Sequence, residues 1–260
     1  MRLIQEAKGF LFDLDGVFVQ SGKPLPGAID TLKSLRSLNI PFRFLTNTTT
    51  ESRETLQSTL NNIGLYCNEE EIFSAGFSGV QAIKAMGYPT CSFYITDDLK
   101  NDYLIFKEDI EKPEVIIIGD YESWNFEKID HAFRCVMNGA KILALHMGKY
   151  FRVDSGLRID AGAFVAALEF ATNKKAMIVG KPNKMFFESA LNHMGLDSED
   201  VVMIGDDLIN DIYGAQELGI PGILVKSGKY HKGMLESSSI IPDGFLESIA
   251  DLPKIISNGD

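Results

Sequence analysis

Residues 8–17 read KGFLFDLDGV, and the interpretation of the whole chain starts from this stretch. Residues 9–12 are apolar and favour β-structure, which is typical of a buried strand in a parallel sheet. Two carboxylates, Asp13 and Asp15, follow at once, with Gly16 behind them. Ligands bind just beyond the carboxyl ends of the strands in open α/β sheets. The pair also fits an ordinary turn in which glycine supplies a positive φ angle, so its meaning depends on the residues that follow the other strands.

The composition restricts the classes of function. The chain has 260 residues, 45% hydrophobic and 23% charged, with a net charge of −11. This balance is typical of a globular protein and argues against nucleic-acid binding, which needs a basic face. No apolar run reaches the length of a membrane span, and we expect the chain to enter its first strand directly, without a signal peptide. The cysteines Cys67, Cys91 and Cys135 form no CxxC pair, so we expect reduced thiols, no zinc site and a cytoplasmic location.

Strands and helices are expected to alternate along the chain. Expected strands cover residues 9–12, 42–45, 72–73, 91–95, 115–118, 141–145, 177–179, 201–204 and 223–225. Expected helices cover residues 28–38, 48–63, 78–86, 126–137, 161–171, 185–194 and 210–218, and the tail from Ser237 should add a turn, a short strand and a final helix. This order predicts an α/β fold with a doubly wound parallel sheet of the Rossmann type. The middle of the chain holds enough elements for a core of its own. We therefore predict a core domain of residues 1–76 and 177–260, with an inserted α/β domain of residues 77–176.

Reactive side chains follow four of the predicted strands, and in a parallel sheet they would meet at one edge. Each has an ordinary alternative: a helix N-cap for the Thr-Asn pair, a solvated loop for the lysine, and a turn before a helix for the Gly-Asp-Asp group. That all four alternatives hold together is much less plausible than a shared site. The residues are Asp13, Asp15, Thr46, Asn47, Lys181, Asp206, Asp207 and Asp211.

The chemistry of this set points to phosphoryl transfer. Clustered carboxylates repel one another unless a cation neutralises them, and a hard divalent ion with oxygen ligands, most simply Mg²⁺, fits the set. A hydroxyl, an amide and an ammonium beside the ion suit an anionic substrate. A carboxylate can also attack phosphorus and form an aspartyl-phosphate.

The motifs DLDG (13–16), TN (46–47), GKP (180–182) and GDD (205–207) with Asp211 resemble the four ordered motifs of haloacid dehalogenase-like phosphatases. The resemblance spans nearly the whole chain and implies a capped Rossmann-like core that uses Mg²⁺. It implies Asp13 as nucleophile, Asp15 as general acid and then base, and Lys181 as a bridge between nucleophile and phosphate. It also implies that Thr46 and Asn47 bind the substrate. The implied metal residues are Asp13, Asp15 through its backbone carbonyl, Asp206, and Asp211 through the lysine and the metal's waters; Asp207 is the least specified member.

The insert resembles the α/β cap of the subgroup that acts on nitrophenyl phosphate, pyridoxal phosphate and nucleotides. Residues 145–151 (LHMGKYF) and 157–162 (LRIDAG) resemble the branch of haloacid dehalogenase-like hydrolase domain-containing protein 2 and phospholysine phosphohistidine inorganic pyrophosphate phosphatase. Many relatives carry Asn-x-Asp where this chain has His146 and Lys149. We expect these two residues to bind the substrate's leaving group, such as a second phosphate. The alternative is a solvated loop whose aromatic residues pack on the cap.

The sequence thus predicts a phosphatase that takes a small phosphorylated substrate, with no nucleic-acid or membrane partner. A homodimer formed through the cap is kept as a hypothesis. The alternatives are a receiver-like or phosphate-binding regulatory protein without turnover, or another reaction of the superfamily, such as that of a phosphomutase or a dehalogenase. A receiver domain would place its phosphorylated aspartate after a middle strand, whereas Asp13 follows the first.

Overall fold

The chain folds into two compact units in a computed structural model that describes residues 2–153, 156–236 and 238–257. The first unit comprises Met1–Thr46, Leu56–Phe73 and Lys181–Asp260, and the second comprises Asn47–Thr55 and Ser74–Gly180. The predicted division into core and cap remains a prediction. It differs from the compact units chiefly in leaving residues 47–55 and 177–180 with the core.

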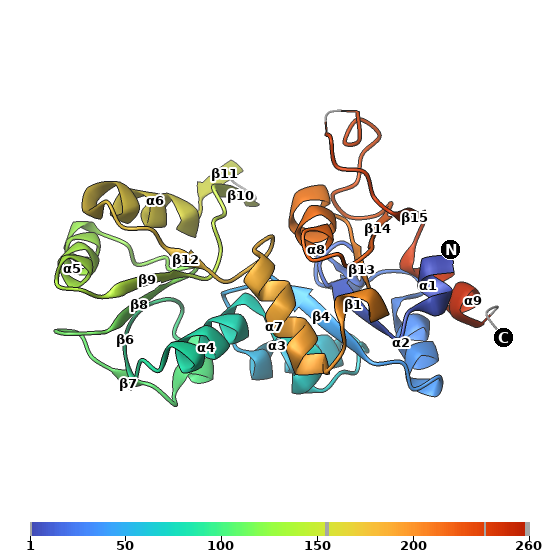
Figure 1. Ribbon diagram of the computed structural model, residues 1–260, viewed down its shortest axis with the longest axis horizontal. Coiled ribbons are helices and arrows are strands. Elements are labelled where there is room, and N and C mark those ends of the chain that lie inside the picture. Colours follow the sequence, from blue (N-terminus) through green and yellow to red (C-terminus); the bar gives the residue numbers. More distant parts are fainter. Residues whose placement is uncertain (1, 154–155, 237, 258–260) are drawn as a thin grey trace. The chain divides into compact units, whose positions relative to one another are not determined.

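The first unit is built on a six-stranded sheet in the order β15-β14-β13-β1-β4-β5, of which all strands but β5 are labelled in Figure 1. β1 pairs in parallel with β13 on one side and with β4 on the other, so the strand order reverses at β1. Such a reversal is where open α/β sheets bind ligands. The strands are β1 (Gly9–Asp13), β4 (Phe42–Thr46), β5 (Ile72–Ser74), β13 (Val201–Gly205), β14 (Gly222–Val225) and β15 (Gly244–Leu246).

Both faces of this sheet are covered, which confirms the predicted doubly wound fold. β1 and β13 are buried at every residue. Alternate residues such as Phe10 and Phe12 join one apolar cluster with α1 (Arg2–Glu6), α2 (Ala28–Ser37), α3 (Arg53–Asn62) and α9 (Leu252–Ser257). On the other face Leu224 packs with Leu208 and Ile212. These two residues belong to the π-helical segment η4 (Leu208–Tyr213), which continues into α8 (Gly214–Gln216), beside α7 (Lys184–Met194).

The second unit contains a five-stranded sheet, parallel throughout, in the order β12-β9-β8-β6-β7. Helices α5 (Phe126–Met137) and α6 (Ala161–Thr172) lie side by side over one face (Figure 1), and α4 (Ala75–Met86) packs against Leu143 and Leu145 on the other. A hairpin of β10 (Tyr150–Val153) and β11 (Gly156–Ile159) precedes α6. The strands of the sheet are β6 (Thr90–Tyr94), β7 (Lys107–Glu108), β8 (Val115–Ile118), β9 (Lys141–Ala144) and β12 (Met177–Ile178).

Three sequence-based expectations were wrong in detail. The chain does not enter β1 directly, because α1 precedes it. The helix expected at 48–63 begins only at Arg53, because Ser52 caps it by accepting from the Thr55 amide, while the Thr49 hydroxyl before it donates to distant Asp120. The strand before Lys181 is β12, which pairs with β9 and so belongs to the second sheet, not the first.

The smaller elements complete the description. The short hairpin β2–β3 follows β1, and 3₁₀ turns connect several of the larger elements. Cys67, Cys91 and Cys135 are free thiols, and all three are buried. Among the described residues, no helix is both long and apolar enough to cross a bilayer. The minor elements are β2 (Val19–Gln20), β3 (Lys23–Pro24), η1 (Glu69–Glu71), η2 (Leu99–Tyr103), η3 (Ser198–Asp200) and η5 (Ile249–Asp251).

Candidate active site

The two aspartates of the first motif are placed differently by β1 and its turn. Asp13 is the last residue of β1 and is 7% exposed, whereas Asp15 is exposed. The turn that follows Asp15 depends on Gly16, whose φ is +89° and whose amide donates to the carbonyl of Val19. A side chain at Gly16 would also collide with Asp206. The sequence therefore folds so that one carboxylate is buried at the strand end and the other lies at the surface two residues later.

Lys181 joins two of the predicted acids inside the first unit. Its Nζ donates to Asp13 Oδ1 at 2.6 Å, to Asp211 Oδ1 at 2.7 Å and to the Leu45 carbonyl at 3.2 Å. Only 5% of the residue is exposed. Burial lowers the pKa of the ammonium, but the attraction of Asp13 and Asp211 outweighs it and leaves the pKa raised. The lysine is therefore charged and fixed, as a group that neutralises a buried anion needs to be.

Asp13, Asp206 and Asp211 form a buried acid cluster. Each offers a carboxylate oxygen, and these oxygens lie within 4.8 Å of one another. Burial raises the pKa of Asp13 to about 6, of Asp206 to about 6 and of Asp211 to about 7, although Lys181 pulls the pKa of Asp13 and Asp211 down. Three carboxylates so close together carry more negative charge than one ammonium neutralises.

One atom of this cluster tests whether a metal ion fits. Asp206 Oδ1 is buried and has no hydrogen-bond partner. A buried polar atom without a partner is costly, and an orphaned carboxylate oxygen among other carboxylates is a ligand that a hard cation can use. The donor set, made only of oxygens, is the kind that Mg²⁺ prefers. The residues present thus fit a divalent ion held by Asp13 and Asp206, with Asp211 beside them.

Comparison with known proteins identifies the family. A model described as haloacid dehalogenase-like hydrolase matches residues 10–104, and a second, HAD-hydrolase-like model matches residues 178–252. Haloacid dehalogenase-like hydrolase domain-containing protein 2 of Homo sapiens is 36% identical over 88% of this chain and 88% of its own length. The chain belongs to the haloacid dehalogenase-like hydrolases. This confirms the resemblance drawn from the motifs.

Phosphatases stand among the family members that this chain is similar to. Phospholysine phosphohistidine inorganic pyrophosphate phosphatase of Xenopus laevis is 32% identical over 96% of this chain and 94% of its own. The p-nitrophenyl phosphatase of Archaeoglobus fulgidus superposes with a TM-score of 0.90 at 26% identity, covering 96% of this chain and 99% of that one. Together with the family models, these relatives identify the chain as a hydrolase of the phosphatase class, as predicted.

The loop after β14 also belongs to this haloacid dehalogenase-like site, although none of its residues was predicted to. The backbone amide of Lys229 donates to Asp206 Oδ2 at 2.7 Å, and its Nζ donates to Asp207 Oδ2 at 2.8 Å. Ser227 Oγ donates to the Gly16 carbonyl at 2.6 Å, which joins this loop to the turn of the first motif. The signal was present, because the strand at 223–225 also ends in polar residues and a glycine, but no residue type there is diagnostic.

Asp207 has a structural role in the geometry of the site. Its Oδ1 accepts from the amides of Ile209 and Asn210, so it is the N-cap of η4. Burial alone would raise the pKa of Asp207, but Lys229 and the hydrogen bonds from Asn210 lower it to about 2. This carboxylate is already fully engaged, which separates it from the orphaned Asp206.

Thr46 and Asn47 are neighbours in the chain that fall in different compact units. Thr46 is the last residue of β4, is 2% exposed, and follows Leu45, which pairs with Asp13 across the sheet. Asn47 begins the segment Asn47–Thr55, which belongs to the second unit. The first of the two is thus held beside the strand end that carries Asp13.

The predicted cap residues His146 and Lys149 lie in different environments. His146 is 7% exposed, and its Nε2 lies 3.7 Å from Asp120 Oδ1 and 3.9 Å from Asp160 Oδ1. Its Nδ1 accepts from the Gly148 amide at 3.1 Å, so in the neutral ring the proton is on Nε2, the atom nearest to the two carboxylates. Lys149 is exposed. Their shared role in recognition stays a prediction.

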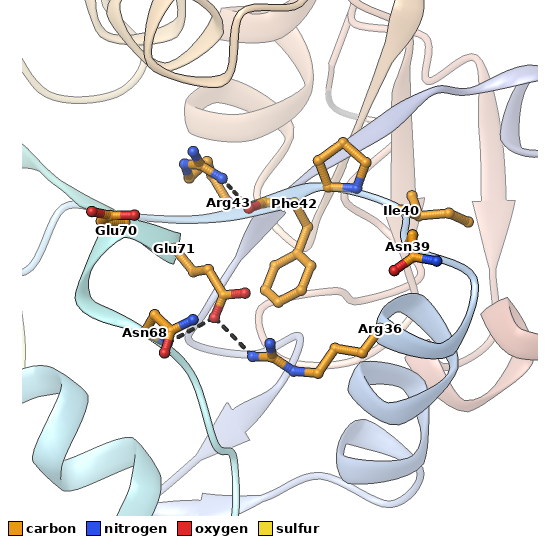
Figure 2. Close-up of a pocket in the computed structure, with 9 residues that line it drawn as sticks. Arg36, Asn39, Ile40, Phe42, Arg43, Asn68, Glu70 and Glu71 are labelled. Atoms are coloured by element: carbon orange, nitrogen blue, oxygen red, sulfur yellow. Dashed lines mark hydrogen bonds and ion pairs between the residues drawn. The ribbon is translucent and has the colours of Figure 1, made fainter.

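A separate pocket opens in the first unit, at the other end of β4. It has a volume of about 460 Å³, and Phe42, its aromatic wall, is the first residue of the strand that ends at Thr46. Figure 2 shows Arg36 reaching across it to Glu71, at 2.8 Å. The pocket is therefore separate from Asp13 and the acid cluster, which lie at the end of β4 that carries Thr46. The lining residues are Arg36, Asn39, Ile40, Pro41, Phe42, Arg43, Asn68, Glu70 and Glu71.

Proposed function

We propose that this hydrolase is a Mg²⁺-dependent phosphatase that cleaves small phosphomonoesters through a phosphorylated Asp13. The observation that carries the proposal is the Lys181 ammonium, which bonds Asp13 and Asp211 at 2.6 and 2.7 Å beside the orphaned oxygen of Asp206. A bound Mg²⁺ would supply positive charge to the transferring phosphoryl group. Lys181 and the Thr46 hydroxyl would add to it from the protein.

The proposed reaction has two steps, formation and hydrolysis of the aspartyl-phosphate. An Asp13 carboxylate oxygen attacks phosphorus, the bond to the leaving oxygen breaks, and Asp15 donates a proton to that oxygen. Asp15 then takes a proton from water, which attacks phosphorus and releases inorganic phosphate with the Asp13 carboxylate restored. The exposure of Asp15, in contrast to buried Asp13, suits a group that exchanges protons with a substrate and with water.

The substrate proposal is a small phosphorylated metabolite, recognised at Thr46 and Asn47 and, on the cap, at His146 and Lys149. The Xenopus relative is named for phospholysine, phosphohistidine and pyrophosphate, so phosphoamides and pyrophosphate belong in the assay beside aryl and alkyl phosphates. The net charge of −11 supports the absence of a nucleic-acid partner. A cytoplasmic location and a homodimer through the cap are proposed as well; sedimentation velocity of the purified chain tests the dimer.

The deciding experiment is turnover of nitrophenyl phosphate with and without Mg²⁺. The wild-type chain should turn over only with the ion, and Asp13→Asn should remove nearly all turnover, because an amide does not attack phosphorus. Asp97→Asn is the matched control, since the Asp97 side chain is 100% exposed. A wild-type chain that binds phosphate but never releases product would favour a regulatory binding protein instead. Substantial turnover by Asp13→Asn would exclude Asp13 as the nucleophile.

A further inference from the structure

The segment Asn47–Thr55, which follows Thr46 directly, is part of the second unit and forms hydrogen bonds with other residues of that unit. The Thr50 carbonyl accepts from Thr96 Oγ1 at 2.8 Å. The Ser52 amide donates to Asp98 Oδ2 at 2.7 Å. Such a chain of bonds leaves the segment little freedom of its own.

Thr49 makes the hydrogen bonds of this segment that lie nearest in sequence to Thr46 and Asn47, the proposed phosphoryl-binding pair. Thr49 Oγ1 donates to Asp120 Oδ2 at 2.7 Å and accepts from the Asp120 amide at 3.0 Å, so the two residues hold each other twice. Thr49 has no exposed surface. A side chain on Gly119 would come within 3.2 Å of the Thr49 Cβ, so β8 ends close against this threonine.

The Asp120 carboxylate is itself fixed. Its Oδ1 faces His146 Nε2 at 3.7 Å, while Oδ2 accepts from Thr49. Burial alone would raise the pKa of Asp120, but its interactions with His146 and with the Thr49 hydroxyl leave the pKa lowered. Thr49 therefore donates to an ionised oxygen, and hydrogen bonds to charged acceptors are about twice as strong as neutral ones.

We propose that Thr49, held by Asp120, is a positioning residue for Asn47 and Thr46. The inference rests on the proposed phosphatase function, because it concerns how that site holds its phosphoryl group. Two residues of chain span at most about 7 Å, so fixing Thr49 restricts where Asn47 can lie. Misplacing a binding group by about 1 Å can cost about 100-fold in rate.

The test compares three threonine variants in the Mg²⁺-loaded, full-length chain. Thr49→Val keeps the side-chain shape and removes both bonds with Asp120. Thr49→Ser keeps the hydroxyl, and Thr50→Val makes the same chemical change at an exposed neighbour. The readouts are kcat, KM and the inhibition constant of inorganic phosphate.

Thr49→Val should raise the inhibition constant of phosphate about tenfold and lower kcat/KM by at least as much, because displacing Asn47 weakens its contact with the phosphoryl group. Thr49→Ser should stay within about twofold of wild type, and Thr50→Val should be unchanged. Asp120→Ala combined with Thr49→Val should be no worse than the more damaging of the two single changes, since either change alone removes the bond between Thr49 Oγ1 and Asp120 Oδ2.

An unchanged inhibition constant of phosphate in Thr49→Val would overturn this inference. It would do so even if kcat fell, because a lower kcat with KM and phosphate inhibition unchanged reports only fewer folded molecules. Failure of the proposed function is separate, because it would appear as absent turnover in the wild-type chain before any variant is compared.

Discussion

Replacing Asp206 by asparagine should stabilise the metal-free protein while removing its response to Mg²⁺. Asp206 is 1% exposed, and burial raises its pKa from 3.8 to about 6. At about 1.36 kcal/mol per pKa unit, the ionised carboxylate lowers the free energy of unfolding by about 3 kcal/mol above pH 6. This figure already includes the hydrogen bond from the Lys229 amide, which favours the ionised form, and asparagine keeps an oxygen for that amide. We therefore expect a net gain of about 3 kcal/mol at pH 7.5.

The sign of the pH dependence follows from the direction of the shift. A carboxyl whose pKa is raised on folding destabilises the protein above its folded pKa, and the cost fades as the pH falls through about 6 toward 3.8. The advantage of Asp206→Asn over wild type should therefore shrink between pH 7.5 and pH 5. With Mg²⁺ at about 100 times its dissociation constant, wild type should gain about 2.7 kcal/mol and the variant almost nothing.

Urea unfolding followed by circular dichroism, in EDTA and in Mg²⁺, measures all of these quantities. Asp97→Asn is again the matched control, because its fully exposed carboxylate should change stability by less than about 0.5 kcal/mol. The reasoning is refuted if metal-free Asp206→Asn is less stable than wild type at pH 7.5. It is refuted equally if the variant keeps the full Mg²⁺ stabilisation.

Three further outcomes are expected. Asp15→Asn should slow alkyl phosphates about 100-fold or more and nitrophenyl phosphate far less, because only the poor leaving group needs its proton; equal losses in steady-state assays would argue against an acid role. Gly228→Ala should destabilise the chain by at least about 2 kcal/mol more than Gly22→Ala in urea titrations, since both glycines have positive φ but only the first would place a Cβ 1.9 Å from Asp206 Oδ2. His146→Ala should lower the free energy of unfolding by about 2 kcal/mol, because two carboxylates are left facing each other; an unchanged melting temperature would contradict this.

The strand framework was predictable because buried parallel strands have a strong local signature. β8, with four consecutive β-branched residues all buried, leaves no other interpretation, and β1 is nearly as clear. Asp13 could be placed for the same reason, since it ends β1. Lys181 follows β12 of the other sheet and Asp211 lies in η4, so the bonds of Lys181 to Asp13 and Asp211, at 2.6 and 2.7 Å, do not come from strand ends shared in one sheet.

What escaped prediction depends on partners distant in sequence. β12 is only two residues long, and its membership of the second sheet is decided by its pairing with β9, which no local pattern reveals. Lys229 reaches the site through a loop amide, and any residue but proline supplies an amide. The late start of α3 has a similar cause, because the amide of Arg53 finds its acceptor in Asp102, about fifty residues further on.

Helix α3 is shared between the two compact units, and this matters when the chain is shortened. Its first turn, through Thr55, belongs to the second compact unit, and the rest belongs to the first. A minimal enzyme made by deleting residues 77–176 would lose Asp98 and Asp102, the acceptors for the amides that begin this helix. Ser52, whose Oγ accepts from the Thr55 amide, would remain as the sole cap among these groups. We therefore expect a shortened chain to be more stable if it keeps the residues of the insert that accept from these amides, so truncation is better planned around the hydrogen bonds of α3 than around the sheet.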